Sequence, residues 1–223
     1  MEKRKALIFG STGLIGNLLL EELVKSENYS GIRIFVRQPT GVTEPKVEEV
    51  TIDFSTLDIF SRFITGDDLF LCLGTTIKKA GSVKKMEEID RDLPVRIAKL
   101  ASLNNVKRVA VVSSLGASAG ARNYYLRIKG EMEKGIIELD FENIAIVRPS
   151  MLLGERKEKR TGETVGKIVM KTFKTFLTGK LRKFRAIHGR DVARAMIAIL
   201  QKDQVKNIYE SDEIQKIADQ YQM

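Results

Sequence analysis

The chain is poor in the residues that build metal centres and disulfide frameworks. Its 223 residues include one cysteine, Cys72, one histidine, His188, and no tryptophan. A single cysteine excludes an internal disulfide, and one histidine without a cysteine cluster does not make a zinc site. We therefore expect no bound metal and a reducing compartment.

Long apolar runs are also missing. No stretch approaches the roughly 20 residues that cross a bilayer, and the apolar run after the basic start 1–5 is too short for a signal peptide. The sequence therefore predicts a cytoplasmic protein without a transmembrane segment. Apolar residues still make up 43% of the chain, which is enough for a sizeable core. We expect one α/β domain over residues 1–223.

Acidic residues are scarce in one part of the chain only. The net charge is +9, and residues 155–190 hold 12 Lys or Arg against 3 Glu, so this segment carries the whole excess. Such a segment attracts phosphate-bearing ligands and leaves a protein partner or an anionic surface open, whereas we expect no nucleic acid. Within it, residues 166–177 are predicted to form a basic amphipathic helix. Its apolar face packs on the domain or closes a largely apolar substrate pocket.

Apolar runs alternate with helical patterns over the first 150 residues. Runs without polar alternation are typical of strands covered on both faces, and their alternation with helices predicts a Rossmann-type doubly wound parallel sheet. A small C-terminal substrate-side lobe follows, with helices at 191–200, capped by Asp191, and 212–220. The expected strands are 6–10, 32–36, 47–54, 69–73, 109–113 and 144–147, and the helices between them are 14–25, 86–103 and 125–138.

The most informative stretch is the glycine-rich turn after the first strand. Gly10, Gly13 and Gly16 are spaced three apart between an apolar strand and an apolar helix. The first allows a tight turn, the second lets the backbone approach a pyrophosphate, and the third allows close helix–sheet packing. The N-terminus of the helix then faces the phosphates. The predicted cofactor contacts of this turn are Gly10, Ser11, Thr12, Gly13, Leu14, Ile15 and Gly16.

The end of the second strand favours NADP(H) over NAD(H). An acidic residue at this position accepts from the ribose 2′-hydroxyl, whereas an arginine suits a 2′-phosphate. Arg37 stands there without a neighbouring carboxylate, so NADP(H) is the preferred cofactor and NAD(H) is left open. After the next strand, Asp53 and Phe54 are assigned to the adenine ring. Alternatively, Asp53 caps a helix that begins near Ser55.

Tyr125 and Lys129 are the candidate proton-transfer residues. They are four residues apart at the start of a predicted helix, so their side chains share one face. A nearby ammonium lowers the pKa of a tyrosine, which makes the phenol usable as an acid or base near neutral pH. The preceding strand ends in Ser113 and Ser114, at the sheet edge where parallel sheets bind ligands.

With these features the chain resembles the short-chain dehydrogenase/reductase superfamily. Within it, the chain is most similar to the atypical NAD(P)H-binding members homologous to the human Tat-interacting protein. The more specific matches are the Leu-Gly-Thr-Thr sequence at 73–76 and the Arg-Pro…Leu-Leu-Gly-Glu-Arg sequence at 148–156. The matching segments are 10–16, 73–81, 113–117, 125–133 and 148–156.

The resemblance implies a catalytic set. Tyr125 would protonate a carbonyl oxygen, Lys129 would lower the pKa of Tyr125 and bind the nicotinamide ribose, and Ser114 would orient the substrate oxygen, with Ser113 as the alternative. Many superfamily members carry an asparagine that completes a proton relay, and Asp90 stands at that position here. The resemblance also implies cofactor contacts from Leu73, Gly74 and Thr75, and, at the nicotinamide end, from Pro149, Ser150 and Met151.

These observations leave three functions open. The first is an NADPH-dependent oxidoreductase that reduces a small, apolar carbonyl compound. The second is a non-catalytic NADPH-binding regulator that acts through protein partners. The third is a nucleotide-sugar epimerase or dehydratase, which usually has a longer C-terminal domain than this chain accommodates.

Overall fold

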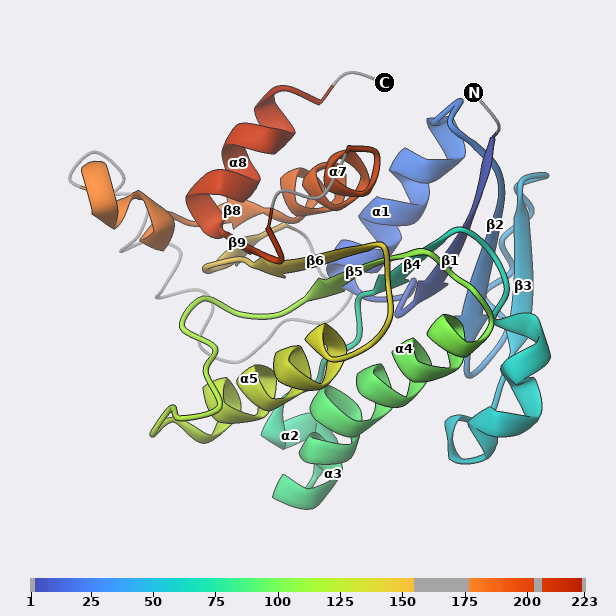
Figure 1. Cartoon of the computed structure of the whole chain (residues 1–223), viewed down its shortest axis with the longest axis horizontal. Helices are drawn as coiled ribbons and strands as arrows, with labels where there is room; N and C mark the ends of the chain where they lie inside the picture. Colours follow the sequence, from blue (N-terminus) through green and yellow to red (C-terminus); the bar gives the residue numbers. More distant parts are fainter. Residues whose placement is uncertain (1–2, 155–176, 203–205, 222–223) are drawn as a thin grey trace.

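A parallel sheet with helices on both faces forms the centre of the molecule (Figure 1). The computed structural model describes residues 3–154, 177–202 and 206–221. Within these residues the main sheet has seven parallel strands in the order β3-β2-β1-β4-β5-β6-β9. This order confirms the predicted Rossmann-type doubly wound sheet. The strands are β1 (Arg4–Phe9), β2 (Tyr29–Val36), β3 (Val47–Thr51), β4 (Asp68–Leu71), β5 (Arg108–Val112), β6 (Asn143–Arg148) and β9 (Ile208–Glu210); β7 (Leu152–Leu153) and β8 (Ile187–His188) form a separate pair.

The helices divide between the two faces of the sheet. One face is covered by α1 (Leu14–Lys25), α7 (Gly189–Leu200) and α8 (Ser211–Asp219). The other face is covered by α4 (Leu93–Leu103), α5 (Tyr124–Ile137) and the 3₁₀ segment Phe54–Phe63. Each layer has its own apolar core, so the sheet is buried from both sides.

Strand β1 shows why the strands consist of continuous apolar runs. Side chains alternate along a strand, so Ala6 and Ile8 pack in the core under α1 and α7. Leu7 and Phe9 pack in the core under α4 and α5, where the Phe9 ring stacks on Phe35 at 4.2 Å between centroids. All four side chains are buried. A fully buried side chain of the larger types stabilises the fold by roughly 1.5–3 kcal/mol, so a polar residue at any of these positions would be costly.

The predicted helix 86–103 is composite. It consists of α3 (Val83–Glu87), a π-helical segment (Glu88–Asp92) and α4, which begins at Leu93 with a proline in its first turn. A short helix, α2 (Ile77–Ala80), precedes them. The third strand ends at Thr51 and not at residue 54, because the chain turns at Asp53 into the 3₁₀ segment.

The prediction that Asp191 caps the helix near the C-terminus is wrong. Helix α7 begins two residues earlier, at Gly189, and its N-cap is His188, whose Nδ1 accepts from the Arg190 N–H at 3.2 Å. Asp191 lies in the first turn, where a negative charge is favourable beside the positive end of the helix dipole.

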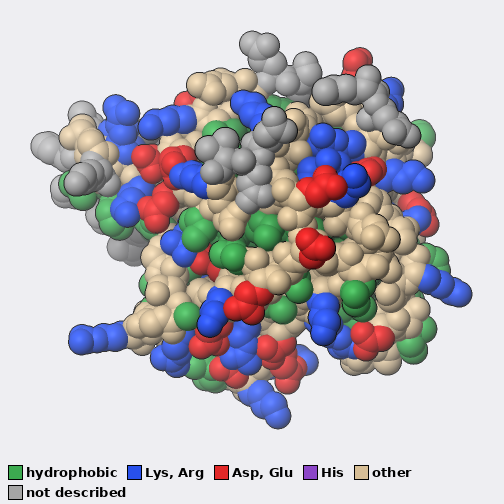
Figure 2. Space-filling view, viewed as in Figure 1, with side chains coloured by type: hydrophobic (Ala, Val, Ile, Leu, Met, Phe, Trp, Pro, Cys, Tyr) green, Lys and Arg blue, Asp and Glu red, His purple; other side chains and the backbone are tan. Residues whose placement is uncertain are grey.

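The basic segment 155–190 is described from residue 177 onward only. The predicted helix 166–177 and its apolar face therefore lie almost wholly outside the described residues. On the face that Figure 2 shows, Lys and Arg side chains are interspersed with Asp and Glu, as expected for a chain that is neutral outside this segment. In the described part of the chain, no helix is long and apolar enough to cross a membrane.

A buried carboxylate joins α1 to α7. Glu22 is 1% exposed and accepts from Arg190 Nη1 at 2.6 Å and from Arg194 Nε at 3.1 Å. Its neighbour Glu21, which is only half-buried, accepts from Arg190 Nη2 at 2.7 Å and from Asn17 Nδ2 at 3.0 Å. Burial raises the pKa of Glu22, but the hydrogen bonds and charges of the two guanidinium groups lower it by more, so its pKa lies below the ordinary value. This contribution to stability is present above the unfolded-state pKa and is lost as the pH falls through the folded-state pKa.

We predict that Glu22→Gln lowers the free energy of unfolding by about 3 kcal/mol near neutral pH, because two guanidinium groups lose their shared counterion. The difference from the wild type should shrink as the pH falls below 4.5, the ordinary pKa of this carboxyl. Chemical denaturation of Glu22→Gln beside Glu21→Gln measures it. Glu21, whose side chain is more exposed than that of Glu22, should contribute less than about 1 kcal/mol, and equal losses for the two variants would contradict the prediction.

Candidate functional site

Two glycines of the turn after β1 leave no room for a side chain at their positions. Gly10 has φ +88°, and a Cβ at this residue would lie 2.6 Å from the carbonyl oxygen of Cys72. A Cβ at Gly16 would lie 2.1 Å from the carbonyl oxygen of Gly10. The first turn of α1 therefore lies directly against the end of the strand, which is the close packing that the sequence predicts.

Donors at this turn are available to a ligand. The N-cap of α1 is Gly13, so no side chain caps the helix, and its first turn carries no acidic residue. The Ser11 hydroxyl is buried and has no hydrogen-bond partner within the described residues. Unpaired N–H groups at a helix N-terminus bind anions. These features fit the pyrophosphate of a dinucleotide.

A cleft of about 610 Å³ continues from the glycine turn to the end of β2. Its lining includes Ser11 and Thr12 of the glycine turn and Arg37 and Thr40 after β2. Arg37 is exposed and makes no ion pair with any other described residue. Its guanidinium is thus available to a phosphate in this cleft.

Asp53 and Phe54 make contacts within the fold. The Asp53 carboxylate accepts from the Ser55 N–H at 2.9 Å, and this bond lowers the pKa of Asp53. The Phe54 ring lies 6.3 Å from that of Phe9. The capping alternative for Asp53 is therefore observed, and contact of these two residues with adenine stays a prediction.

Lys129 and Asp90 form a buried ion pair. Lys129 Nζ lies 2.9 Å from Asp90 Oδ1 and donates to the Val112 carbonyl at the end of β5 at 3.5 Å. Burial lowers the pKa of Lys129, but Asp90 above all, together with Tyr125 and Glu133, raises it, so its pKa lies above the ordinary value. Lys129 is therefore charged in the neutral range, one helical turn after Tyr125.

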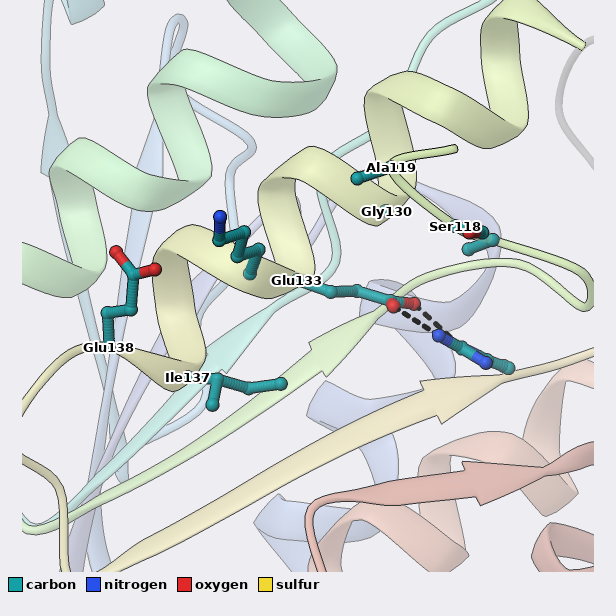
Figure 3. A pocket seen from close by; sticks show the side chains of 9 residues that line it. Ser118, Ala119, Gly130, Glu133, Ile137 and Glu138 are labelled. Atoms are coloured by element: carbon teal, nitrogen blue, oxygen red, sulfur yellow. Dashed lines mark hydrogen bonds and ion pairs between the residues drawn. The ribbon is translucent and has the colours of Figure 1, made fainter. Parts of the chain in front are cut away.

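The two candidate serines differ in their surroundings. Ser113 is buried and donates its hydroxyl to Glu133 of α5, which Arg148 Nε also contacts at 2.9 Å. In Figure 3 the Glu133 side chain points away from α5, and the dashed lines at its carboxylate mark the bonds to Arg148. Ser114 is half-buried, and no described residue bonds its hydroxyl. Ser114 is thus the serine whose hydroxyl is available to a ligand.

Glu133 is a residue that the sequence reasoning missed. A single glutamate on a helix usually belongs to the solvated face, but this one is buried. The signal was its position four residues after Lys129, because residues four apart share one helix face. Glu133 and Arg148 also line a cavity of about 460 Å³ with Ser118 (Figure 3). Tyr125 and Lys129 do not line that cavity.

The segments after β4 and β6 complete the edge of the sheet. Thr75 donates its N–H to Asp90 Oδ2 at 3.0 Å, which places residues 73–75 against the ion pair. The Pro149 carbonyl accepts from Leu115 N at 3.0 Å, and the Ser150 hydroxyl donates to the Arg185 carbonyl. Met151 is exposed. The residues predicted after β1, β4, β5 and β6 therefore lie along one edge, at the carboxyl ends of parallel strands, where ligands bind such sheets.

Comparison with known proteins gives the same fold and a family. A family described as NAD(P)H-binding matches residues 10–203. FMP52, a mitochondrial protein of Eremothecium gossypii, is 32% identical over 225 residues, covering 96% of this chain and 97% of the relative. HTATIP2 of Rattus norvegicus is 34% identical over 167 residues, covering 73% and 69% of the two chains. A putative NAD-dependent epimerase/dehydratase from Bacillus halodurans has a TM-score of 0.68 at 19% identity, covering 97% and 99%.

We predict that Gly130→Ala destabilises the protein by about 2 kcal/mol or more, because its Cβ would lie 2.1 Å from the Ser118 carbonyl carbon and would displace the loop after β5. The matched control is Gly135→Ala on the same helix. Its Cβ would meet the side chain of Val95, with the nearest methyl group at 3.0 Å, and alanine favours a helix by roughly 1 kcal/mol. Thermal unfolding of both variants measures the difference, and similar midpoints would rule out the tight contact.

Proposed function

Because this chain belongs to the NAD(P)H-binding family, we propose that it is an NADPH-dependent oxidoreductase of the atypical short-chain dehydrogenase type that reduces a small, apolar carbonyl compound. Tyr125 is the general acid. The observation that carries the proposal is the buried, ion-paired Lys129 one turn after Tyr125, whose ammonium lies at the end of β5, the strand that Ser113 and Ser114 follow.

In this proposal three side chains take part in the reduction of the carbonyl group. The Tyr125 hydroxyl donates its proton to the carbonyl oxygen, and the Lys129 ammonium stabilises the phenolate that results. Ser114 donates a hydrogen bond to the same oxygen and so orients the substrate. A bound nicotinamide cofactor supplies the hydride that the carbonyl carbon receives.

Residues along the same sheet edge would hold the cofactor. The turn 10–16 would bind the pyrophosphate through backbone N–H groups and the Ser11 hydroxyl, and Arg37 would bind a 2′-phosphate. Residues 73–75 and 149–151 would flank the nicotinamide end, and Asp53 and Phe54 the adenine. A preference for NADP(H) rests on Arg37 alone, since the family description and the neighbours with bound NAD distinguish no cofactor.

The apolar character of the substrate and the cellular compartment are inferred from the sequence. An apolar substrate is inferred from residues 166–177, of which only the last is described. A cytoplasmic location stays a prediction beside relatives that are named as mitochondrial. Contact of the basic segment with a protein partner or an anionic surface is likewise a proposal.

We predict that Tyr125→Phe lowers kcat for carbonyl reduction by about 100-fold or more, because the proton donor is lost, while NADPH affinity is kept. NADPH oxidation with a panel of carbonyl compounds measures it. The matched control is Tyr124→Phe, the preceding residue, whose hydroxyl interacts with Glu87. Full activity in Tyr125→Phe would exclude it as the acid. Tight NADPH binding by the wild type without turnover of any compound would favour the regulator.

We predict that Arg37→Ala weakens NADPH binding by about 10- to 100-fold and leaves NADH binding unchanged, because a hydrogen-bonded charge pair with the 2′-phosphate contributes roughly 1.5–3 kcal/mol. Calorimetric titration with both cofactors measures it. Gln38→Ala, which alters the next residue of the same cleft without a change of charge, is the control. Equal weakening for NADH and NADPH would contradict a 2′-phosphate contact.

A further inference from the structure

Asp90 occupies an unusual place in the fold. It lies in the π-helical segment Glu88–Asp92, between α3 and α4, and its side chain is fully buried. A π-helical segment interrupts the regular hydrogen-bond ladder and redirects the side chains that it carries. A buried carboxylate is costly unless it is paired and hydrogen-bonded. The partners of Asp90 therefore define what this residue does.

Each oxygen of Asp90 contacts a different part of the candidate site. Oδ1 lies 2.9 Å from Lys129 Nζ on α5, and Oδ2 accepts from the Thr75 N–H after β4 at 3.0 Å. The backbone of Gly74 covers this pair, since a Cβ there would lie 3.3 Å from Oδ1 and 4.0 Å from Lys129 Nζ. Asp90 thus connects the ammonium to the backbone that is expected to flank the cofactor.

The other charged groups near Lys129 do not replace Asp90. From α5, Glu133 faces Lys129 but already binds the guanidinium of Arg148 on β6, and Tyr125 is neutral when it acts as an acid. From β5, the nearest partner is the uncharged Val112 carbonyl. Among the described residues, Asp90 is therefore the one carboxylate that pairs directly with Lys129.

We propose that Asp90 is a positioning residue: its carboxylate fixes the Lys129 ammonium against residues 73–75 and keeps that ammonium charged beside Tyr125. The importance of Asp90 for catalysis rests on the proposed function, whereas its contact with Lys129 does not. Without the carboxylate charge, burial lowers the pKa of Lys129. The charged ammonium beside Tyr125 is then lost at a lower pH than in the wild type.

The direct test is a pH titration of Lys129 in Asp90→Asn. It is monitored by NMR of labelled lysine side chains in the protein without cofactor. The Lys129 signal is identified by its absence in Lys129→Arg. We expect the pKa of Lys129 to fall by about two units or more, within the 3–5 units that burial can produce. The matched control, Asp92→Asn, changes an exposed carboxylate of the same segment that pairs with Arg91. It should leave the titration unchanged, and an unshifted Lys129 in Asp90→Asn would overturn the proposal.

Two further measurements extend the test. One applies if the variant is too unstable to titrate, and the other applies if carbonyl reduction is measurable. If Asp90→Asn is too unstable to titrate, the added substitution Lys129→Met should restore its unfolding midpoint towards the wild type, because no charge is then left unpaired. No restoration would overturn a role through Lys129. Where carbonyl reduction is measurable, the alkaline fall of kcat should move to lower pH by about one unit or more in Asp90→Asn only. An unmoved fall would contradict the positioning role, whereas a wild type that binds NADPH without turnover defeats the proposed function and leaves the Lys129 titration to decide.

Discussion

The structure depends first on the contact between the end of β1 and the first turn of α1. The carbonyl oxygen of Gly10 lies where a side chain at Gly16 would begin. Strand and helix are therefore closer than they could be with any residue other than glycine at position 16. This contact aims the uncapped N-terminus of α1 along the carboxyl edge of the sheet. The ends of β4, β5 and β6 follow in this order along the same edge.

Buried carboxylates hold the elements around the sheet together. Glu22 joins α1 to α7, Asp90 joins the segment after β4 to α5, and Glu133 joins α5 to β6 and to the hydroxyl of Ser113. A buried charge that loses its partner is strongly destabilising, so each pair admits one arrangement of its two elements. The catalytic proposal therefore relies on side chains that the fold itself keeps in place.

The apolar runs were sufficient to predict the doubly wound sheet, because strands such as β1 are buried on both faces. Helix α1 has the predicted bounds, since a glycine and a helical apolar pattern define its start. The strand β9 was missed, because its three residues form no apolar run. The N-cap of α7 was misassigned to Asp191, because an imidazole nitrogen performs the capping from His188.

The sequence predicted which residues form the candidate site, but not which side chains those residues contact. The glycine spacing and the pair Tyr125 and Lys129 are local patterns, which one segment displays by itself. The difference between Ser113 and Ser114 depends on Glu133, and the charge of Lys129 depends on Asp90, which lies 39 positions earlier. Contacts of this kind form only when the chain folds, so neither propensity nor periodicity reports them.

In the proposed function, one sheet edge holds the whole cofactor, with its nicotinamide end beside Tyr125. A crystal structure of the protein with bound NADPH tests it most directly. The account predicts the pyrophosphate on the turn 10–16, the 2′-phosphate at Arg37, and the nicotinamide ribose within hydrogen-bond distance of Lys129. A nicotinamide ring remote from Tyr125, with the pyrophosphate still on the glycine turn, would contradict it.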